Sequence, residues 1–371
     1  MASISEQNDN KAHNASNETI LSARIHEYRK PLTIDRITKP IVNSGEQVLL
    51  RVGAAGLCHS DLHLINGEWK DVIPVPLPIT PGHEVAGWVE EIGNSVPQGL
   101  LDKGDLVAVF GGWGCGVCVY CKGGEEQLCD YPTWPGFSSL DGGYSESILI
   151  PSYRFLIRVD KKYGLKPEEL APLTDAGLTP YRAIKKVKHI LDPGTSVAVV
   201  GIGGLGSYAI QYAKLLAPNS NTIAIDVNDN KLELAEKLGV ADYTLNSKTT
   251  PDVRSEVYKI TEGKGVSAVI DCVGAEETIR ESASILGKRG VLVVVGLFGP
   301  EIRMPLVSSV ISEYQVMCSL WGSYNELREV IEFAKKRKIK HSFQKFSLND
   351  INEALDSLRA GQIIGRGVVI P

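Results

Sequence analysis

The apolar positions of this chain follow two different patterns, which divide it into regions of different predicted structure. From about residue 25 to residue 157, short apolar runs alternate with frequent Gly and Pro, as is typical of β-strands joined by long loops. From about residue 194 to residue 297, compact apolar runs are separated by helical stretches, which predicts a parallel sheet with helices on both faces. The predicted strands are 48–52, 85–92, 106–110 and 147–150 in the first region and 196–200, 222–225, 268–270 and 291–295 in the second, with helices at 230–238 and 276–286.

The two ends of the chain differ from these regions. The first 20 residues are polar and nearly free of large apolar side chains, so we predict a disordered tail. After residue 317 we expect a helix at 325–337, and residues 351–360 lead to a strand at 367–370.

Composition and charge narrow the function classes. A chain of 371 residues with 43% apolar and 22% charged residues is long enough for two domains and an ample core. A net charge of −5 argues against a nucleic-acid or anionic-membrane partner. No apolar run approaches the length of a membrane span, and the polar N-terminus lacks the apolar core of a secretory signal. We therefore expect a cytoplasmic protein.

Four of the seven cysteines lie in one short stretch with the spacing C-x2-C-x2-C-x7-C: Cys115, Cys118, Cys121 and Cys129. Four thiolates satisfy Zn²⁺ completely and leave no position for a substrate, so this zinc is predicted to be structural. The alternative of disulfides is weaker, because the number of cysteines is odd and cytosolic thiols stay reduced. The chemistry must then lie elsewhere in the chain.

A glycine-rich turn follows the predicted strand at 196–200 and opens a predicted helix at 207–216. Gly201 permits a tight turn, Gly203 lets the backbone approach a pyrophosphate, and Gly206 allows the helix to pack closely on the strand. Gly204 and Leu205 complete the turn at the helix N-terminus, whose free N–H groups favour phosphates.

An acidic residue follows at the distance expected for a dinucleotide site. Asp226 comes twenty residues after Gly206 and ends the predicted strand at 222–225. A carboxylate here binds the adenosine ribose hydroxyls and repels a 2′-phosphate, and no Arg follows it, so NAD is favoured over NADP. Without the glycines, Asp226 would be read as a turn or N-cap residue. Lys231 either meets the ribose or faces solvent.

A second set of candidate metal ligands lies near the start of the chain. Cys58 precedes the segment His59-Ser60-Asp61, and His83 follows 25 residues later. Cys and His both bind zinc, although a single Cys or His is more often a core or surface residue.

Five motifs in order make the chain similar to the zinc-dependent medium-chain alcohol dehydrogenases. They are G-L-C-H-S-D at 56–61, G-H-E-x-x-G at 82–87, the four cysteines, the glycine turn, and Gly365-Arg366. The resemblance implies an α/β fold: a GroES-like, mostly β catalytic domain split around a Rossmann domain with a doubly wound parallel sheet, often in a homodimer or homotetramer, of which we favour the tetramer. With the tail at 1–20, it divides the chain into the catalytic domain at 21–176, the Rossmann domain at 177–312 and a return to the catalytic domain at 313–371.

The resemblance also implies the roles of several residues. Cys58 and His83 bind a catalytic zinc, and the third ligand position, frequently Cys in the family, is occupied here by Asp175. Carboxylate is a competent zinc ligand, and some secondary-alcohol dehydrogenases of the family carry Asp there. The alternative role of Asp175 is that of a helix N-cap.

The remaining roles are also carried over by position. Ser60 matches the hydroxyl that accepts the alcohol proton, and His63 matches the outer end of the relay to solvent. Asp61 would orient His83, and Glu84 lies beside the metal. Gly296 and Arg366 match positions near the nicotinamide and the pyrophosphate, and Trp113 and Trp134 match the substrate pocket. Cys272 and Cys318 lie in or beside apolar strands and are expected to be buried core thiols.

The sequence therefore predicts an enzyme with two zinc ions and NAD that transfers a hydride between an alcohol, preferably secondary, and NAD. The partner is a small-molecule alcohol, ketone or aldehyde. Three alternatives remain: a polyol or sugar dehydrogenase, a zinc-free quinone or enone reductase of the same superfamily, and a nucleotide-binding structural protein without catalysis. Two zinc ions per chain would fit a zinc dehydrogenase, one would fit a structural site only, and none would fit the reductase.

Overall fold

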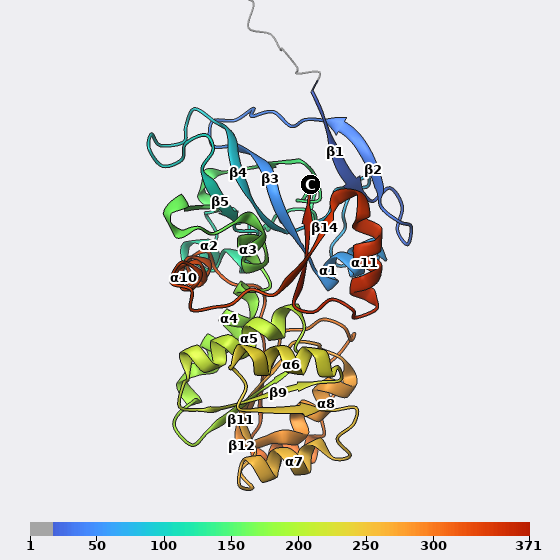
Figure 1. Cartoon of the computed structure of the whole chain (residues 1–371), viewed down its shortest axis with the longest axis vertical. Helices are drawn as coiled ribbons and strands as arrows, with labels where there is room; N and C mark the ends of the chain where they lie inside the picture. Colours follow the sequence, from blue (N-terminus) through green and yellow to red (C-terminus); the bar gives the residue numbers. More distant parts are fainter. Residues whose placement is uncertain (1–17) are drawn as a thin grey trace, which may run out of the picture.

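The computed structural model describes residues 18–371, which form two units, one built on a mixed sheet and one on a parallel sheet (Figure 1). The tail predicted at residues 1–20 lies outside the described residues up to residue 17. The predicted end of the tail at residue 20 is wrong, because Thr19 and Ile20 already belong to strand β1 (Thr19–Arg24). Ile20 is buried, with 4% exposure. A single apolar side chain followed by alternating residues is enough to start a strand when a partner strand is present.

The first unit surrounds a seven-stranded sheet with the order β14-β15-β3-β4-β5-β7, with β6 also paired to β3. β1 and β2 form a separate antiparallel pair. The strands are β2 (Thr33–Thr38), β3 (Val48–Leu57), β4 (Glu84–Ile92), β5 (Leu106–Val109), β6 (Ser147–Ile150), β7 (Leu156–Val159), β14 (Phe343–Ser347) and β15 (Arg366–Ile370). The helices of this unit are α1 (His59–Ile65), α2 (Val119–Lys122), α3 (Pro167–Leu170), α10 (Tyr324–Lys335) and α11 (Ile351–Arg359). Helix α4 (Leu178–Val187) lies at the junction and packs against the second unit.

Strand β15 belongs to this sheet although it comes from the C-terminal end of the chain. It lies between β14, to which it is parallel, and β3, to which it is antiparallel. β3 has an almost continuously buried pattern because β4, β6 and β15 cover its edges and other elements cover its faces. The ends of β3 and β15 therefore meet in the interior of the molecule.

The second unit is a six-stranded parallel sheet with the order β10-β9-β8-β11-β12-β13. This is the 3-2-1-4-5-6 order of a Rossmann fold, as predicted. The strands are β8 (Ser196–Val200), β9 (Asn221–Asp226), β10 (Tyr243–Asn246), β11 (Val266–Asp271), β12 (Leu286–Val294) and β13 (Gln315–Cys318), and the helices are α5 (Gly204–Leu216), α6 (Asp229–Leu238), α7 (Val253–Ile260), α8 (Glu276–Ile285) and α9 (Leu306–Ser312).

The predicted boundary at residue 313 is too early, because β13 is the sixth strand of the parallel sheet. This strand was missed because it lies at the edge of the sheet and three of its four residues are exposed, so it lacks a buried apolar run. Beyond it, α10 packs against α4.

A continuous core connects the two units. One cluster of buried side chains extends from β3 and β5 through α4 to β8 and α5, with Val52, Ala108, Ile184, Val199 and Tyr208 among its members. The two sheets are therefore held by shared packing at their junction. None of the helices among residues 18–371 is both long and apolar enough to cross a membrane.

Candidate active site

The four cysteines of the predicted zinc lobe converge around one point. The sulfurs of Cys115, Cys118, Cys121 and Cys129 all lie within 4.8 Å of one another. Short helix α2 begins after Cys118, and a turn of 3-10 helix ends before Cys129, so local backbone turns aim the sulfurs inward. Backbone N–H groups donate to these sulfurs, including Cys115 N to Cys129 Sγ at 3.2 Å and Tyr131 N to Cys129 Sγ at 3.3 Å.

The dimensions of this cluster fit a tetrahedral zinc ion. Four sulfurs at about 2.3 Å from zinc lie about 3.8 Å apart from one another. Cys118 Sγ and Cys129 Sγ are 3.9 Å apart. The backbone N–H groups of Cys121 and Asp130 lower the pKa of Cys118 to about 6, which favours its thiolate, whereas burial raises the pKa of Cys121 to about 12. The donor set is complete and leaves no free position.

The second cluster is assembled from three distant segments. Cys58 stands between β3 and α1, His83 immediately precedes β4, and Asp175 follows a turn of 3-10 helix before α4. Together with Glu84, their ligand atoms all lie within 4.8 Å of one another. Cys58 and His83 are buried, and Asp175 is 9% exposed.

The distances within this cluster also fit zinc. A tetrahedral zinc ion separates a sulfur from an oxygen ligand by about 3.6 Å and a nitrogen from an oxygen ligand by about 3.4 Å. Asp175 Oδ2 lies 3.6 Å from Cys58 Sγ and 3.4 Å from His83 Nε2. Burial raises the pKa of Asp175, but His83 and Arg366 outweigh it and hold this pKa well below its usual range. Asp175 therefore presents an ionised carboxylate.

The alternative N-cap role of Asp175 is not supported by the geometry. Helix α4 begins at Leu178, and its N-cap is Gly177. The second carboxylate oxygen of Asp175 accepts a hydrogen bond from Thr179 Oγ1 at 2.6 Å, which fixes the orientation of the first.

Asp61 lies behind His83. Its Oδ1 is 3.4 Å from His83 Nδ1, and its Oδ2 accepts from Cys58 N at 2.9 Å and lies 2.7 Å from Tyr144 Oη. Asp61 and Tyr144 are both fully buried. This contact orients the ring of His83 so that Nε2 points toward Cys58 and Asp175. Sequence reasoning missed Tyr144, which carries no motif.

Glu84 is held by Arg366 rather than free. Arg366 Nε donates to Glu84 Oε2 at 3.0 Å, and its Nη2 pairs with Glu84 Oε1. The same nitrogen lies 3.5 Å from Asp175 Oδ2. On its other side, Arg366 lies directly against Gly204, where a Cβ would be 2.5 Å from Arg366 Nη1. Arg366 thus connects the metal cluster with the glycine turn.

The glycine turn has the geometry of a phosphate cradle. Gly201 has a φ of +84°, which disfavours any residue with a side chain. A Cβ on Gly206 would lie 1.8 Å from Gly201 O, whereas a Cβ on Gly203 would meet nothing within 4 Å. Gly206 therefore permits close packing of α5, and Gly203 leaves open space at the helix N-terminus for a pyrophosphate.

Asp226 stands at the end of β9 beside this turn. Its Oδ2 accepts from Ile202 N at 2.6 Å and its Oδ1 from Asn228 N at 2.9 Å. The next residue, Val227, is 61% exposed and carries no charge. Lys231 follows in the first turn of α6 and is half-buried.

A cavity of about 400 Å³ connects the metal cluster with the nucleotide cradle. Cys58, Ser60, His83 and Asp175 line it together with Leu205 from the start of α5. Gly296 lines the same cavity, and a Cβ there would overlap the backbone of Val273. The outer wall is aromatic and includes Trp69, Trp134, Phe137 and Trp321.

Two predictions about individual residues in this region are wrong. Trp113 does not line it: the side chain is 1% exposed and stacks on Phe155 in the core. Cys318 is not a buried core thiol, because β13 is an edge strand and the thiol is exposed and lines the cavity. Trp321, which the sequence did not indicate, donates from Nε1 to Thr174 O at 2.8 Å and packs edge-on against His83.

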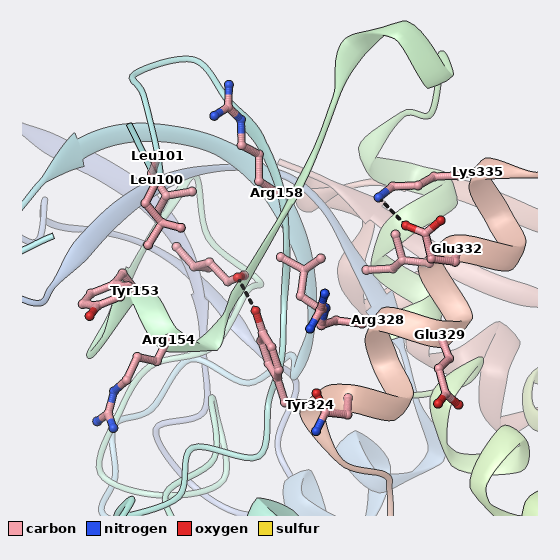
Figure 2. Close-up of a pocket in the computed structure, with 14 residues that line it drawn as sticks. Leu100, Leu101, Tyr153, Arg154, Arg158, Tyr324, Arg328, Glu329, Glu332 and Lys335 are labelled. Carbon is pink, nitrogen blue, oxygen red and sulfur yellow. Dashed lines mark hydrogen bonds and ion pairs between the residues drawn. The ribbon is translucent and has the colours of Figure 1, made fainter. Parts of the chain in front are cut away.

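A larger hollow lies elsewhere, between the loop after β6 and helix α10 (Figure 2). It measures about 1020 Å³, and neither metal cluster contributes to it. Arg158 is paired with Asp105 at 2.9 Å, and Lys335 with Glu332 at 2.8 Å. Tyr324 Oη donates to Leu156 O at 3.1 Å. This hollow is a junction between elements and contains none of the predicted chemistry.

Comparisons with known proteins agree with this site. Residues 44–161 match the family model of the alcohol dehydrogenase GroES-like domain, and residues 204–336 match that of zinc-binding dehydrogenases. The NAD-dependent alcohol dehydrogenase of Sulfurisphaera tokodaii is 40% identical over 94% of this chain and 99% of its own length.

Two further relatives indicate the range of the similarity. The crystal structure of the alcohol dehydrogenase from Aeropyrum pernix has a TM-score of 0.87 and 38% identity, and the match covers 95% of this chain and all of that one. A D-arabinose 1-dehydrogenase (NADP(+)) from Saccharolobus solfataricus is 35% identical over 94% of this chain and 97% of its own length.

Proposed function

The chain belongs to the zinc-dependent medium-chain alcohol dehydrogenase family, and we propose that it oxidises a secondary alcohol to the ketone with NAD⁺ as hydride acceptor: R–CHOH–R′ + NAD⁺ gives R–CO–R′ + NADH + H⁺. The observation that carries this proposal is the meeting of two sites in one cavity. A three-ligand zinc geometry formed by Cys58, His83 and Asp175 faces the glycine turn and Gly296 across about 400 Å³.

The side chains around this cavity have different roles in the proposed reaction. Cys58, His83 and Asp175 would hold a zinc ion, and because all three line the cavity, a substrate there could reach it. When bound, zinc supplies Lewis acidity at this site and NAD supplies the hydride acceptor. Ser60, whose Oγ lies 3.6 Å from Cys58 Sγ and lines the cavity, takes the hydroxyl proton of the substrate. His63, later on α1, passes it toward solvent.

NAD rather than NADP follows from the surroundings of Asp226. Its carboxylate stands where the ribose hydroxyls would bind, and the exposed Val227 offers no positive charge to a 2′-phosphate. We assign Gly201, Gly203, Gly204, Leu205 and Gly206 to the pyrophosphate side of the cofactor, Lys231 to the ribose side, and Gly296 to the nicotinamide side. Arg366 neutralises charge between the cofactor and Glu84.

The walls of the cavity support an alcohol substrate over a sugar. Trp69, Trp134, Phe137 and Trp321 present a broad apolar surface to the substrate, whereas a sugar requires several hydrogen-bonding side chains. A secondary alcohol carries two carbon substituents, and this wide aromatic wall accommodates both.

We further propose a homotetramer, because two separate apolar faces are exposed. One surrounds α9 and the edge strand β13, with Leu306, Val307, Ile311 and Val316 between 40% and 76% exposed. The other lies on the four-cysteine lobe and includes Val117, Val119 and Tyr131, between 69% and 75% exposed. Two distinct self-complementary faces generate four subunits related by three twofold axes. The size of the particle in solution tests this.

The cysteines also support a reducing compartment, and we propose the cytoplasm. Cys58, Cys115, Cys118, Cys121, Cys129, Cys272 and Cys318 all stand as free thiols. Five of them belong to the two metal clusters, where oxidation would prevent metal binding.

The decisive experiment combines metal analysis with a substrate screen. The purified protein should contain two zinc ions per chain and oxidise secondary alcohols with NAD⁺ at a higher kcat/KM than primary alcohols, polyols or aldoses. One zinc ion per chain with no turnover would support the non-catalytic alternative, and a metal-free active protein would support the reductase alternative.

A further inference from the structure

The side chain of His63 is held by a carboxylate that no motif indicated. His63 Nδ1 forms a short hydrogen bond with Glu68 Oε2, and the imidazole ring stacks on Trp69 with 4.7 Å between ring centroids. The side chain of His63 is 14% exposed, whereas that of Glu68 is 46% exposed. The pair therefore reaches from the interior to solvent.

The backbone brings this pair together through a local turn. Helix α1 ends at Ile65, and Gly67 adopts a left-handed φ of +67°, which reverses the chain. Glu68 N then donates to His63 O at 3.0 Å, and Asn66 Nδ2 donates to Glu68 Oε1 at 2.9 Å. Both carboxylate oxygens are thus occupied, so the side chain has a fixed orientation despite its exposure.

We propose that Glu68 is a positioning residue of the proton path, which fixes His63 with its proton on Nδ1 and leaves Nε2 to accept the proton that comes from Ser60. This rests on the proposed function. A carboxylate bonded to one ring nitrogen selects the tautomer in which the other nitrogen is free, and it stabilises the imidazolium that forms when that nitrogen is protonated. The imidazolium then releases the accepted proton to water, which returns His63 to the neutral form with its proton on Nδ1.

The charge state of Glu68 agrees with this role. Partial burial raises the pKa of Glu68, but the hydrogen bonds from His63 and Asn66 outweigh it, and the pKa is lowered overall. Glu68 is therefore ionised throughout the pH range of catalysis. The other ionisable groups near the pair are Arg29, whose Nε lies 3.4 Å from Asn66 O, and His59, one turn earlier on α1. Burial lowers the pKa of His59 to about 4, so its ring is neutral during catalysis. Helix α11 packs against α1 and carries Glu353, Asp356 and Arg359 at exposed positions.

The chain offers a matched control, because a second histidine forms a similar pair away from the cavity. His26 Nε2 lies 2.6 Å from Asp35 Oδ2, and both side chains are exposed at 50% and 30%. A carboxylate–histidine pair that acts only as a surface ion pair contributes little to stability or rate. Asp35→Asn removes this charge without touching the proposed path.

The test is the pH profile of kcat/KM for alcohol oxidation by the zinc-loaded enzyme with NAD⁺. Glu68→Gln should lower the plateau about tenfold and move the acidic limb to lower pH, because the imidazolium loses its counter-charge. Glu68→Asp should largely restore both, and Asp35→Asn should leave both unchanged. In a His63→Gln background, Glu68→Gln should have no further effect. The thermal midpoint should not change in any of these variants.

Each contrary result has a definite meaning. An unchanged profile in Glu68→Gln, or effects of Glu68→Gln and His63→Gln that multiply, would refute the role of Glu68 while the proposed function stands. Absence of NAD⁺-dependent oxidation in the unmodified enzyme would refute the proposed function and this role together.

Discussion

The two candidate metal clusters of this protein are assembled in opposite ways. The four-cysteine lobe takes all its ligands from residues 115–129, lies partly exposed, and is shaped by backbone N–H groups that donate to sulfur. The Cys58/His83/Asp175 cluster takes its ligands from three segments up to 117 residues apart and lies buried where two sheets meet. The first cluster is local in sequence, whereas the second requires distant segments that only the tertiary fold brings together.

This difference assigns the two clusters to different tasks. A closed set of four thiolates stabilises the loop that carries it and excludes substrate. We propose that the open set of three ligands, oriented by Asp61 and Thr179 and bordered by a cavity, holds the reactive metal. The following predictions separate the two clusters by experiment.

The largest effect is expected from Asp175→Ala. It removes one of three ligands, so the catalytic zinc should be lost and turnover should fall by on the order of 10³-fold or more, about 4 kcal/mol of transition-state stabilisation. Metal analysis should find one zinc per chain, retained in the lobe. Asp175→Cys should keep two zincs and part of the activity. Two zincs and near-normal turnover in Asp175→Ala would show that Asp175 is not a ligand.

Next is the loss of a lobe ligand. Cys118→Ser leaves three thiolates and should lower Tm by about 10 °C or more, because metal binding there contributes to folding. Turnover per zinc-loaded catalytic site should change little. Cys318→Ser, which removes an exposed cysteine outside both clusters, is the control and should leave Tm unchanged. Full stability with lost turnover in Cys118→Ser would mean that the roles of the two clusters are exchanged.

A third test asks whether the nucleotide cradle, another element local in sequence, can be changed independently of the metal. Asp226→Ser with Val227→Arg removes the negative charge and adds a positive one, so the ratio of kcat/KM for NADP⁺ and NAD⁺ should rise roughly 10²-fold, about 2.8 kcal/mol. Zinc content should stay at two per chain. The unmodified enzyme should strongly prefer NAD⁺, and equal use of both cofactors would contradict the ribose role of Asp226.

The smallest change in stability is expected from chelation at neutral pH. The catalytic cluster has an open corner and a carboxylate ligand, so a chelator should remove its zinc first and abolish turnover while Tm falls only slightly. Added zinc should restore activity. If the lobe metal left first, with a large drop in Tm before any loss of turnover, the proposed difference between closed and open sites would be wrong.

The same contrast explains what the sequence predicted well. The lobe, the glycine turn and Asp226 are defined by short spacings in the sequence. Within one loop or one βα unit, such a spacing largely determines how far apart the residues lie in space. The strands β8, β9, β11 and β12 are buried apolar runs of the parallel sheet, and all four were predicted within a few residues. Cys58, His83 and Asp175 required the family resemblance, because nothing local in the sequence places them together.

The errors have physical causes as well. β13 and Cys318 lie on an exposed edge, where a strand needs no apolar run, and Trp113 is as compatible with a core as with a pocket. Tyr144, Trp321 and Glu68 carry no motif, and each acquires its contact through tertiary packing or a single left-handed glycine. Such residues are recognised only once the neighbours are known.

Arg366 sets a condition on how this enzyme is made. It pairs with Glu84 across 282 residues of chain, and its strand β15 enters the sheet beside β3 only after the entire parallel-sheet unit has been synthesised. On the ribosome, the four-cysteine lobe can take up its metal early. The reactive centre lacks Arg366 until β15 emerges. We therefore expect a nascent chain to bind metal at the four-cysteine lobe before the pair of Glu84 with Arg366 can form.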